Sequence, residues 1–143
     1  MIEALQPHLP FESTETFTSF VRRLAHFHTG KGPERLLGDH EIDPREINRG
    51  SPVAVDAISR ISGVNDLALA GSTIGRIDRC RIFRGERWSR EFVTPEGSRF
   101  CPDCLAEDMG NSGVFHQKIR IVWRLRSVFT ARFTSASLPG SIT

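Results

Sequence analysis

The sequence predicts a mainly α-helical protein, and three observations lead to this fold class. An apolar stripe with helical spacing runs through residues 9–30, short segments with helix start and stop signals fill residues 30–72, and helical periodicity disappears after residue 77. The 143 residues are 38% apolar and 25% charged, which is typical of a soluble globular chain with one ordinary domain or two small ones. The longest apolar runs are only a few residues, so neither a membrane span nor a membrane partner is expected.

The clearest helix lies within residues 9–30. Its apolar side chains recur at three- and four-residue spacing and form one stripe: Phe17, Phe20, Val21, Leu24 and Phe27. Ser13 or Thr14 is expected to cap this helix, with Glu15 in its first turn. Gly30 is the stop signal that follows the last apolar residue.

Residues 51–71 have the outline of a helix-turn-helix. The first helix of the pair has one apolar face, made by Val55, Ile58 and Ile61. Gly63 is a stop signal, and Asn65 can cap a second short helix over 65–71. That second helix carries no Lys or Arg, whereas a helix that reads base edges usually brings Arg, Lys, Asn or Gln to the groove. We therefore interpret the pair as structural or protein-contacting, with direct base readout as the alternative.

Residues 76–98 are expected to form an irregular or short-strand linker, because Gly85, Pro95 and Gly97 signal turns. Cys80 lies in this segment and is interpreted as a half-buried free thiol rather than as a third metal ligand. The charge also changes here, since residues 76–143 hold 12 Lys+Arg, all but one of them Arg, and 7 Asp+Glu. Arg makes bidentate contacts with phosphate and carboxylate, so this half is expected to face nucleic acid or an acidic partner, with a solvated surface as the alternative.

The stretch RFCPDCLAEDM (99–109) contains a Cys-x-x-Cys pair, Cys101 and Cys104. Two thiolates at this spacing on a tight turn aim at one point, which is half of a tetrahedral zinc site. A redox pair and two unrelated surface cysteines are the alternatives, and the redox pair is disfavoured because turn residues rather than a strand precede it. His116 is the downstream ligand candidate, because residues 121–143 contain no Cys, His, Asp or Glu. The sequence therefore predicts an incomplete zinc site.

Four basic residues follow the cysteine pair and are the predicted phosphate contacts: Lys118, Arg120, Arg124 and Arg126. Binding to duplex DNA through its backbone would weaken steeply with added salt, whereas salt-insensitive binding would indicate contact with a protein.

No segment has the pattern of a catalytic centre, so an enzyme is not expected. The sequence shows no activated nucleophile motif and no paired carboxylates, and GKGPE (30–34) is too short for a phosphate-binding loop. The N-terminus lacks the basic start and apolar run of a secretory signal. The expected location is therefore cytoplasmic, including association with the nucleoid.

Four segments, taken together and in order, resemble the TniQ family of transposition proteins (TnsD/TniQ-like). They are PFESTETFTSFVRRLAHFHTG, RGSPVAVDAISRISGV, RFCPDCLAED and WRLRSV, and the resemblance covers residues 9–128. It implies a small helical N-terminal domain followed by a zinc-ribbon-like C-terminal segment, with Cys101 and Cys104 as zinc ligands. It also implies a non-enzymatic accessory factor in DNA transposition. Such a factor helps target-site selection by linking DNA or a targeting complex to an ATPase regulator and, through it, the transposase. The alternative is a protein–protein adaptor without direct nucleic-acid contact.

The sequence departs from the family pattern after WRLRSV, where the family places Cys-x-x-His. If Thr130 is encoded by ACT, a reading frame shifted by one base gives Cys at the junction with Ala131, and Phe133–Thr134 gives His or Tyr. We therefore expect a small frame-changing deletion or insertion that truncates the protein and impairs its function. The expected organisation is a helical region over 9–75, the linker over 76–98, a partial zinc-binding region over 99–128 and an aberrant or disordered tail over 129–143. The gene sequence tests this expectation, since another codon at position 130 contradicts it.

Overall fold

The computed structural model describes residues 9–77, 79–93, 100–112 and 117–125. Within these ranges the chain forms six α-helices and one three-stranded sheet, so the prediction of a mainly helical fold is confirmed. The helical part comes first and consists of α1 (Phe17–Thr29), α2 (Pro33–Asp39), α3 (Pro44–Arg49), α4 (Pro52–Ser62) and α5 (Asp66–Ala70). The remaining elements are β1 (Ile74–Ile77), β2 (Cys80–Phe83), β3 (Glu86–Ser89), the 3-10 helix η1 (Arg90–Phe92), α6 (Pro102–Ser112) and the 3-10 helix η3 (Ile121–Arg124).

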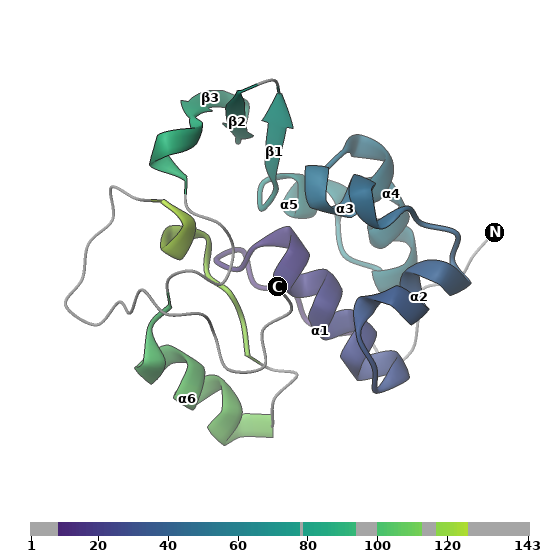
Figure 1. The fold of residues 1–143 in the computed structure, drawn as a ribbon. Coiled ribbons are helices and arrows are strands. Elements are labelled where there is room, and N and C mark those ends of the chain that lie inside the picture. The colour runs from purple at the N-terminus through teal and green to yellow at the C-terminus, as the bar shows by residue number, and fades with distance from the viewer. Residues whose placement is uncertain (1–8, 78, 94–99, 113–116, 126–143) are drawn as a thin grey trace.

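The apolar stripe of α1 is the centre of the main core, as its spacing predicted. Helices α2 to α5 contribute buried residues to the same core, and Figure 1 shows α2 beside α1 with α3, α4 and α5 above it. The buried apolar residues of this core are Leu9, Phe17, Phe20, Val21, Leu24, Ala25, Leu36, Leu37, Ile47, Ala54, Val55, Ile58, Ile61 and Leu69. Burying a side chain of this size contributes about 1.5 to 3 kcal/mol, so this cluster is the main source of stability of the helical part.

Helix α1 begins later than the sequence indicated. Its N-cap is Thr16, whose hydroxyl accepts the N–H of the third helical residue, so neither Ser13 nor Thr14 is the cap. Ser13 and Thr14 instead form a turn, and Glu15 and Thr16 are extended, with the N–H of Thr16 donating to the carbonyl of Ile119 at 2.9 Å. Glu15 consequently lies outside the first turn of α1 and is fully buried. A hydrogen bond to a residue about one hundred positions later in the sequence therefore decides where α1 begins, and the local capping signals do not.

Helices α4 and α5 confirm the helix-turn-helix outline. Gly63 ends α4 in the left-handed conformation, with φ of 76°, and Asn65 caps α5 by accepting two backbone N–H groups. Helix α5 has only five residues, so it is shorter than the expected 65–71. It buries Leu69 and leaves Leu67 78% exposed. A helix of one and a half turns with one buried side chain is a poor candidate for insertion into a DNA groove.

The segment expected to be an irregular or short-strand linker contributes to a regular antiparallel sheet of strand order β1-β2-β3. Ile77 pairs with Cys80 in the first ladder, and Phe83 pairs with Glu86 in the second. Arg84 and Gly85 connect β2 and β3 with φ values of 51° and 81°. Two successive residues with positive φ are typical of a type I′ turn, which matches the twist of the strands that it joins.

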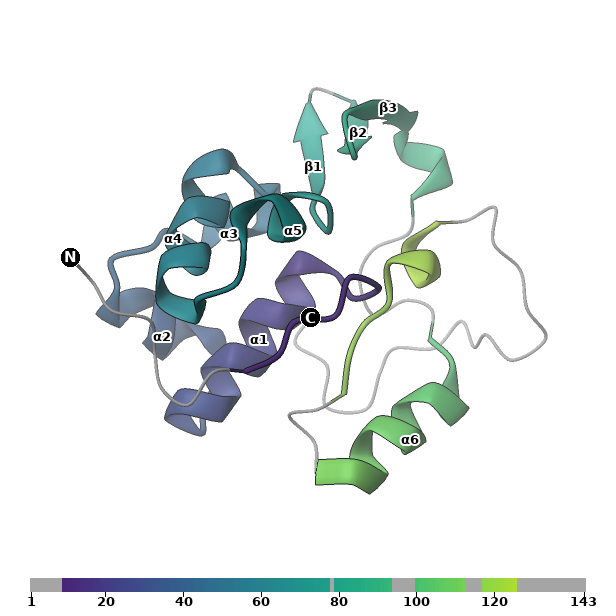
Figure 2. The ribbon, with the colours of Figure 1, turned by 180° about the vertical axis from the view of Figure 1, so that it is seen from behind.

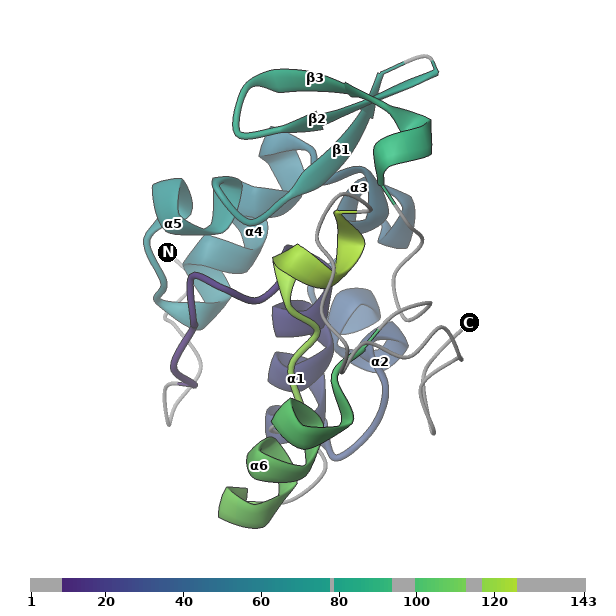
Figure 3. The same ribbon diagram turned by 90° about the vertical axis from the view of Figure 1, so that its left-hand side faces the viewer.

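Helix α6 and the segment after it form a second, smaller core. Its buried residues are Phe100, Cys101, Leu105, Ile119 and Trp123. The segment at residues 117–121 is also paired with the residues before α1, since the N–H of Ile121 donates to the carbonyl of Thr14 at 2.8 Å and Glu15 forms an antiparallel bridge with Arg120. Figures 2 and 3 show this yellow-green segment beside the start of the chain, with the sheet and α6 at opposite ends of the molecule.

Candidate functional site

The two cysteines of the Cys-x-x-Cys pair lie at the start of α6. The sequence predicted a tight turn here, whereas Pro102 is the first residue of an eleven-residue helix, a position that suits its fixed φ and missing N–H. Cys101 is buried and Cys104 is partly exposed, and the carbonyl of Cys101 accepts the N–H of Leu105 at 3.2 Å. The two thiols lie close enough together for Cys101 to influence the pKa of Cys104. The structure therefore brings the predicted pair together.

The thiol of Cys104 is protonated at neutral pH. Burial raises the pKa of Cys104 above its ordinary value of 9.0, and the hydrogen bond and charge of Cys101 raise it further, while the positive charge of Arg120 opposes the shift. Redox-active and nucleophilic cysteines have the opposite property, a pKa that is lowered towards or below 7. The environment of this pair thus argues against the redox alternative. It is compatible with metal binding, because a bound cation displaces the thiol protons.

The described residues fit only half of a tetrahedral zinc site. No group of three or more Cys, His, Asp or Glu side chains is placed to hold a metal ion within the described ranges. Cys80 lies on β2, at the other end of the molecule from α6 (Figures 1 and 3), so it is not a substitute ligand. His116, the downstream candidate, falls outside the described residues, as do positions 131–134, where the shifted frame placed a second pair.

Asp108 lies on α6, and its carboxylate binds the segment of chain that follows this helix. Its carboxylate accepts two hydrogen bonds from the guanidinium of Arg120, one of 2.8 Å, and a third from the backbone N–H of Lys118 at 3.0 Å. The guanidinium of Arg120 also lies over the ring of Trp123, 5.2 Å from its centroid. Burial lowers the pKa of Arg120, but the hydrogen bonds and charge of Asp108 outweigh this effect and raise it. Asp108 therefore fixes the segment after α6.

The predicted phosphate contacts occupy three different situations. Lys118 is 13% exposed and forms a 2.8 Å ion pair with Glu12, and Arg120 is 18% exposed and paired as described above. Phosphate contact by either side chain requires an internal ion pair to open. Arg124 lines a pocket, and Arg126 lies outside the part of the chain that the structure describes.

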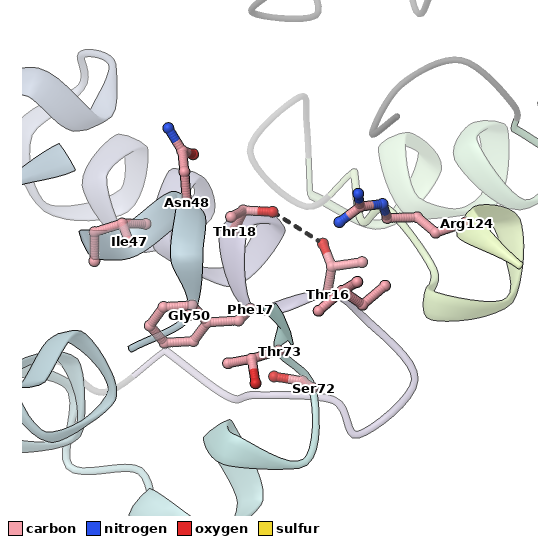
Figure 4. Close-up of a pocket in the computed structure, with 10 residues that line it drawn as sticks. Thr16, Phe17, Thr18, Ile47, Asn48, Gly50, Ser72, Thr73 and Arg124 are labelled. Atoms are coloured by element: carbon pink, nitrogen blue, oxygen red, sulfur yellow. Dashed lines mark hydrogen bonds between the residues drawn. The ribbon is translucent and has the colours of Figure 1, made fainter. Parts of the chain in front are cut away.

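The pocket beside Arg124 lies where α1, α3, β1 and η3 meet. Figure 4 shows the guanidinium of Arg124 directed towards the hydroxyls of Thr16 and Thr18, which lie 3.4 Å apart. Asn48, Ser72 and Thr73 are the other polar residues that line this pocket. The Thr16 hydroxyl is already used to cap α1. We therefore interpret this pocket as a polar contact between secondary-structure elements rather than an open binding cavity.

A buried ion pair, which the sequence gave no reason to expect, lies beneath the paired segments. Glu15 is 0% exposed and Arg23 is 2% exposed, and their charged groups lie 3.2 Å apart. The hydroxyl of Ser19 donates to Glu15 at 3.3 Å and accepts the N–H of Ile119 at 2.9 Å. Burial raises the pKa of Glu15 from 4.5 to about 7, although the charge of Arg23 opposes the shift. Glu15 lies before the first residue of α1, so its contact with Arg23 depends on the path of the chain before the helix and not on a helical repeat.

These observations define a class of protein: a mainly helical domain whose cysteine-bearing C-terminal segment is paired with its first residues. Within the described ranges, titratable side chains that lie close together interact with one another, either as ion pairs or as the pair of thiols. No helix in the same ranges is both long and apolar enough to cross a membrane.

The sequence profile of the TniQ family matches residues 7–130, so the chain belongs to the TniQ family. The resemblance to this family that the four sequence segments indicated is thereby confirmed. TniQ proteins are associated with transposition and form an accessory family rather than a catalytic one. Comparison with curated proteins and with solved structures gave no match.

Proposed function

We propose that this protein is an accessory factor that helps a transposon choose its insertion site. It would link DNA or a targeting complex to the ATPase regulator of transposition and, through that regulator, to the transposase. One observation carries the proposal: the family match runs without a break over residues 7–130, across both the helical part and the cysteine segment. The pairing of Ile119 and Ile121 with the residues before α1 supports it, because it makes these two parts one folded unit.

We also propose that Cys101 and Cys104 supply two thiolate ligands to a structural zinc ion. The position of both thiols at the start of α6, in the same small core, supports this role. Zinc would replace the thiol protons and hold the start of α6 to the segment that supplies the remaining ligands. Because the described residues offer two ligands, the other two would come from residues beyond the described ranges, such as His116, or from a partner protein.

The experiment that tests the proposed role is a transposition assay in cells, in which insertion sites are sequenced with and without this chain. We expect that deletion of the gene abolishes insertion at the preferred target, and that wild-type protein supplied from a plasmid restores it. An unchanged frequency and distribution of insertions after deletion would contradict the proposal. A variant with Phe20→Asp, which places a charge in the main core, is the matched loss-of-fold control.

A protein–protein adaptor without direct nucleic-acid contact is the second candidate function. It is favoured by α5, which carries no cationic residue and exposes Leu67. A pull-down with the purified ATPase regulator, comparing wild type with Leu67→Ser, distinguishes the two candidates. Binding that depends on Leu67 and is unaffected by added DNA favours the adaptor.

A further inference from the structure

Arginines are concentrated in the three-stranded sheet. Residues 76–90 contain six of them and only two acidic residues. Four of the six have described side chains, and we call these the sheet arginines: Arg79, Arg81, Arg84 and Arg87. Three of them are exposed and Arg81 is partly exposed.

The sheet arginines differ from the exposed arginines of the helices in their ion pairing. On the helices, four exposed arginines each pair with a carboxylate close by in sequence, in the pairs Arg35–Asp39, Arg45–Asp43, Arg49–Glu46 and Arg60–Asp56. None of the sheet arginines forms an ion pair with another described residue, although Glu86 and Glu91 lie in the same part of the chain. Their positive charge is therefore not neutralised from within the described structure.

The register of the sheet distributes these charges around the β2–β3 hairpin. Arg87 pairs with Ile82, and Arg81 pairs with Trp88, so Arg87 and Arg81 lie on opposite faces of the hairpin. Arg84 lies in the turn at its tip, where its Nε donates to the carbonyl of Gly71 at 3.0 Å and its guanidinium lies over the ring of Phe83. Arg79 precedes β2 at the other end. Positive charge thus surrounds the hairpin instead of forming a patch on one face.

The sheet lies at one end of the molecule, and the hydrogen bond from Arg84 to Gly71 holds the turn of the hairpin to the body. Strand β1 packs closely against the body, because a Cβ atom placed on Gly75 would lie only 3.0 Å from the carbonyl oxygen of Arg49. Strands β2 and β3 lie beyond β1 and away from α6 in all three views (Figures 1, 2 and 3). A ligand can therefore approach the hairpin without displacing a helix.

We propose that the β2–β3 hairpin is a DNA-binding surface, in which the sheet arginines contact the phosphates of a duplex. The inference rests on the proposed function for its choice of DNA, and it assigns the contact to the sheet rather than to the helix pair or to Lys118 and Arg120. Guanidinium groups bind phosphate oxygens through charge and hydrogen bonds, and exposed arginines without a carboxylate partner are free to make these contacts.

Charged residues on an edge strand have another established use, which is to prevent pairing with a second sheet. Strand β3 is an edge strand of this sheet in the described structure, and it carries Arg87. Preventing such pairing needs only a charge, of either sign, and does not need any affinity for DNA. The two explanations are separated by measuring DNA binding directly.

The test is fluorescence anisotropy of a labelled duplex a few helical turns long, titrated with the full-length protein. Arg79→Gln with Arg87→Gln removes two exposed sheet arginines whose side chains form no hydrogen bond or ion pair within the described structure, so the fold should be retained, and thermal melting checks this. We expect this double variant to bind about tenfold more weakly than wild type at about 50 mM salt, with a slope of log affinity against log salt that is shallower by about 2.

Two further double variants serve as controls. Arg35→Gln with Arg60→Gln removes the same net charge from exposed, ion-paired positions on the helices and should bind within about twofold of wild type. Arg79→Lys with Arg87→Lys keeps the charge and should restore most of the affinity, because phosphate contact needs the charge more than the shape of the side chain.

Three results would overturn the inference: no measurable affinity of the wild type for duplex DNA, equal affinities of the sheet variant and wild type, or an equal loss in the helix control. Binding of poly-glutamate without binding of duplex would also overturn it and indicate an acidic protein partner. The transposition assay separates this inference from the proposed function. A chain that is required for targeted insertion but whose sheet variant binds DNA normally disproves only the inference. A chain that is dispensable for insertion but binds DNA through the sheet disproves only the proposed function.

Discussion

The backbone N–H of Ile119 donates a 2.9 Å hydrogen bond to the hydroxyl of Ser19, although the two residues are one hundred positions apart in the chain. Both residues are buried, with exposed fractions of 1%. The same hydroxyl donates to Glu15, so Ser19 connects helix α1, the residues before it and the segment after α6. Four predictions follow from this contact and from others around it.

Replacing Ser19 by Ala is expected to lower the free energy of unfolding by about 1 to 3 kcal/mol, because the buried N–H of Ile119 loses its acceptor. Urea denaturation followed by far-UV circular dichroism measures the change. Ser13→Ala is the matched control, since Ser13 is exposed, and it should change stability by less than about 0.5 kcal/mol. Equal stabilities of the two variants would contradict the structural role of the Ser19 hydroxyl.

Glu15 makes the stability depend on pH. Its folded pKa is about 7 and its ordinary value is 4.5, so between these values the folded state keeps a proton that the unfolded state has lost. Stability is therefore highest below pH 4.5 as far as this group is concerned, and it falls as the pH rises to 7, by up to about 3 kcal/mol.

The variant Glu15→Gln isolates this effect, because the amide cannot titrate. We expect the unfolding free energies of variant and wild type to converge near pH 5 and to differ most near pH 8. His28 acts in the opposite direction, since burial lowers its pKa, but it is present in both proteins and cancels in the difference. A difference between the two proteins that does not change with pH would show that Glu15 stays ionised in the folded state.

Asp108→Ala is expected to destabilise the C-terminal segment by about 3 kcal/mol, because it leaves the partly buried guanidinium of Arg120 without its counter-ion. Urea denaturation followed by tryptophan fluorescence reports this, since Trp123 is buried beneath Arg120. Asp56→Ala breaks an exposed ion pair with Arg60 and should cost less than about 1 kcal/mol. A similar cost for both variants would show that the Asp108 pair is no stronger than a surface pair.

The cysteine pair is expected to bind zinc and to react slowly when it is free of metal. The zinc that the purified protein binds, measured by elemental analysis, should be lost in Cys101→Ala, whereas Cys80→Ser should keep it. In metal-free protein, alkylation of Cys104 should be slow at pH 7 and accelerate only above about pH 9, because burial raises its pKa. Zinc retained by Cys101→Ala, or fast alkylation at pH 7, would contradict the proposed site.

The elements that the sequence predicted correctly are those with a strong local pattern. The stripe from Phe17 to Phe27 gave helix α1, and Gly63 with Asn65 gave the break between α4 and α5, because apolar spacing and cap chemistry act within a few residues. The strands of the sheet were harder to predict from the sequence. Its strands have four residues each, and arginines occupy positions on both faces, which hides the alternation expected of a half-buried strand.

The candidate site was predicted in its residue types but not in its surroundings. The spacing of Cys101 and Cys104 was enough to bring the two thiols together, since a single turn of chain determines it. The state of Lys118 and Arg120 was not predictable, because their counter-ions, Glu12 and Asp108, are 106 and 12 residues away. Charge counts indicated a basic half, and only the fold distinguished paired from unpaired arginines.

The sequence by itself determined the helical class, the positions of most helix ends, the cysteine pair and the family. These depend on patterns that local chemistry imposes on neighbouring residues. Tertiary structure alone decided that Thr16 caps α1, that Glu15 is buried with Arg23, and that residues 117–121 pair with the start of the domain. Those outcomes depend on which groups meet in the folded chain, because a buried N–H or carboxylate is stable only when a partner is present. For the N–H groups of Thr16, Ile119 and Ile121 that partner is about one hundred residues away in the sequence.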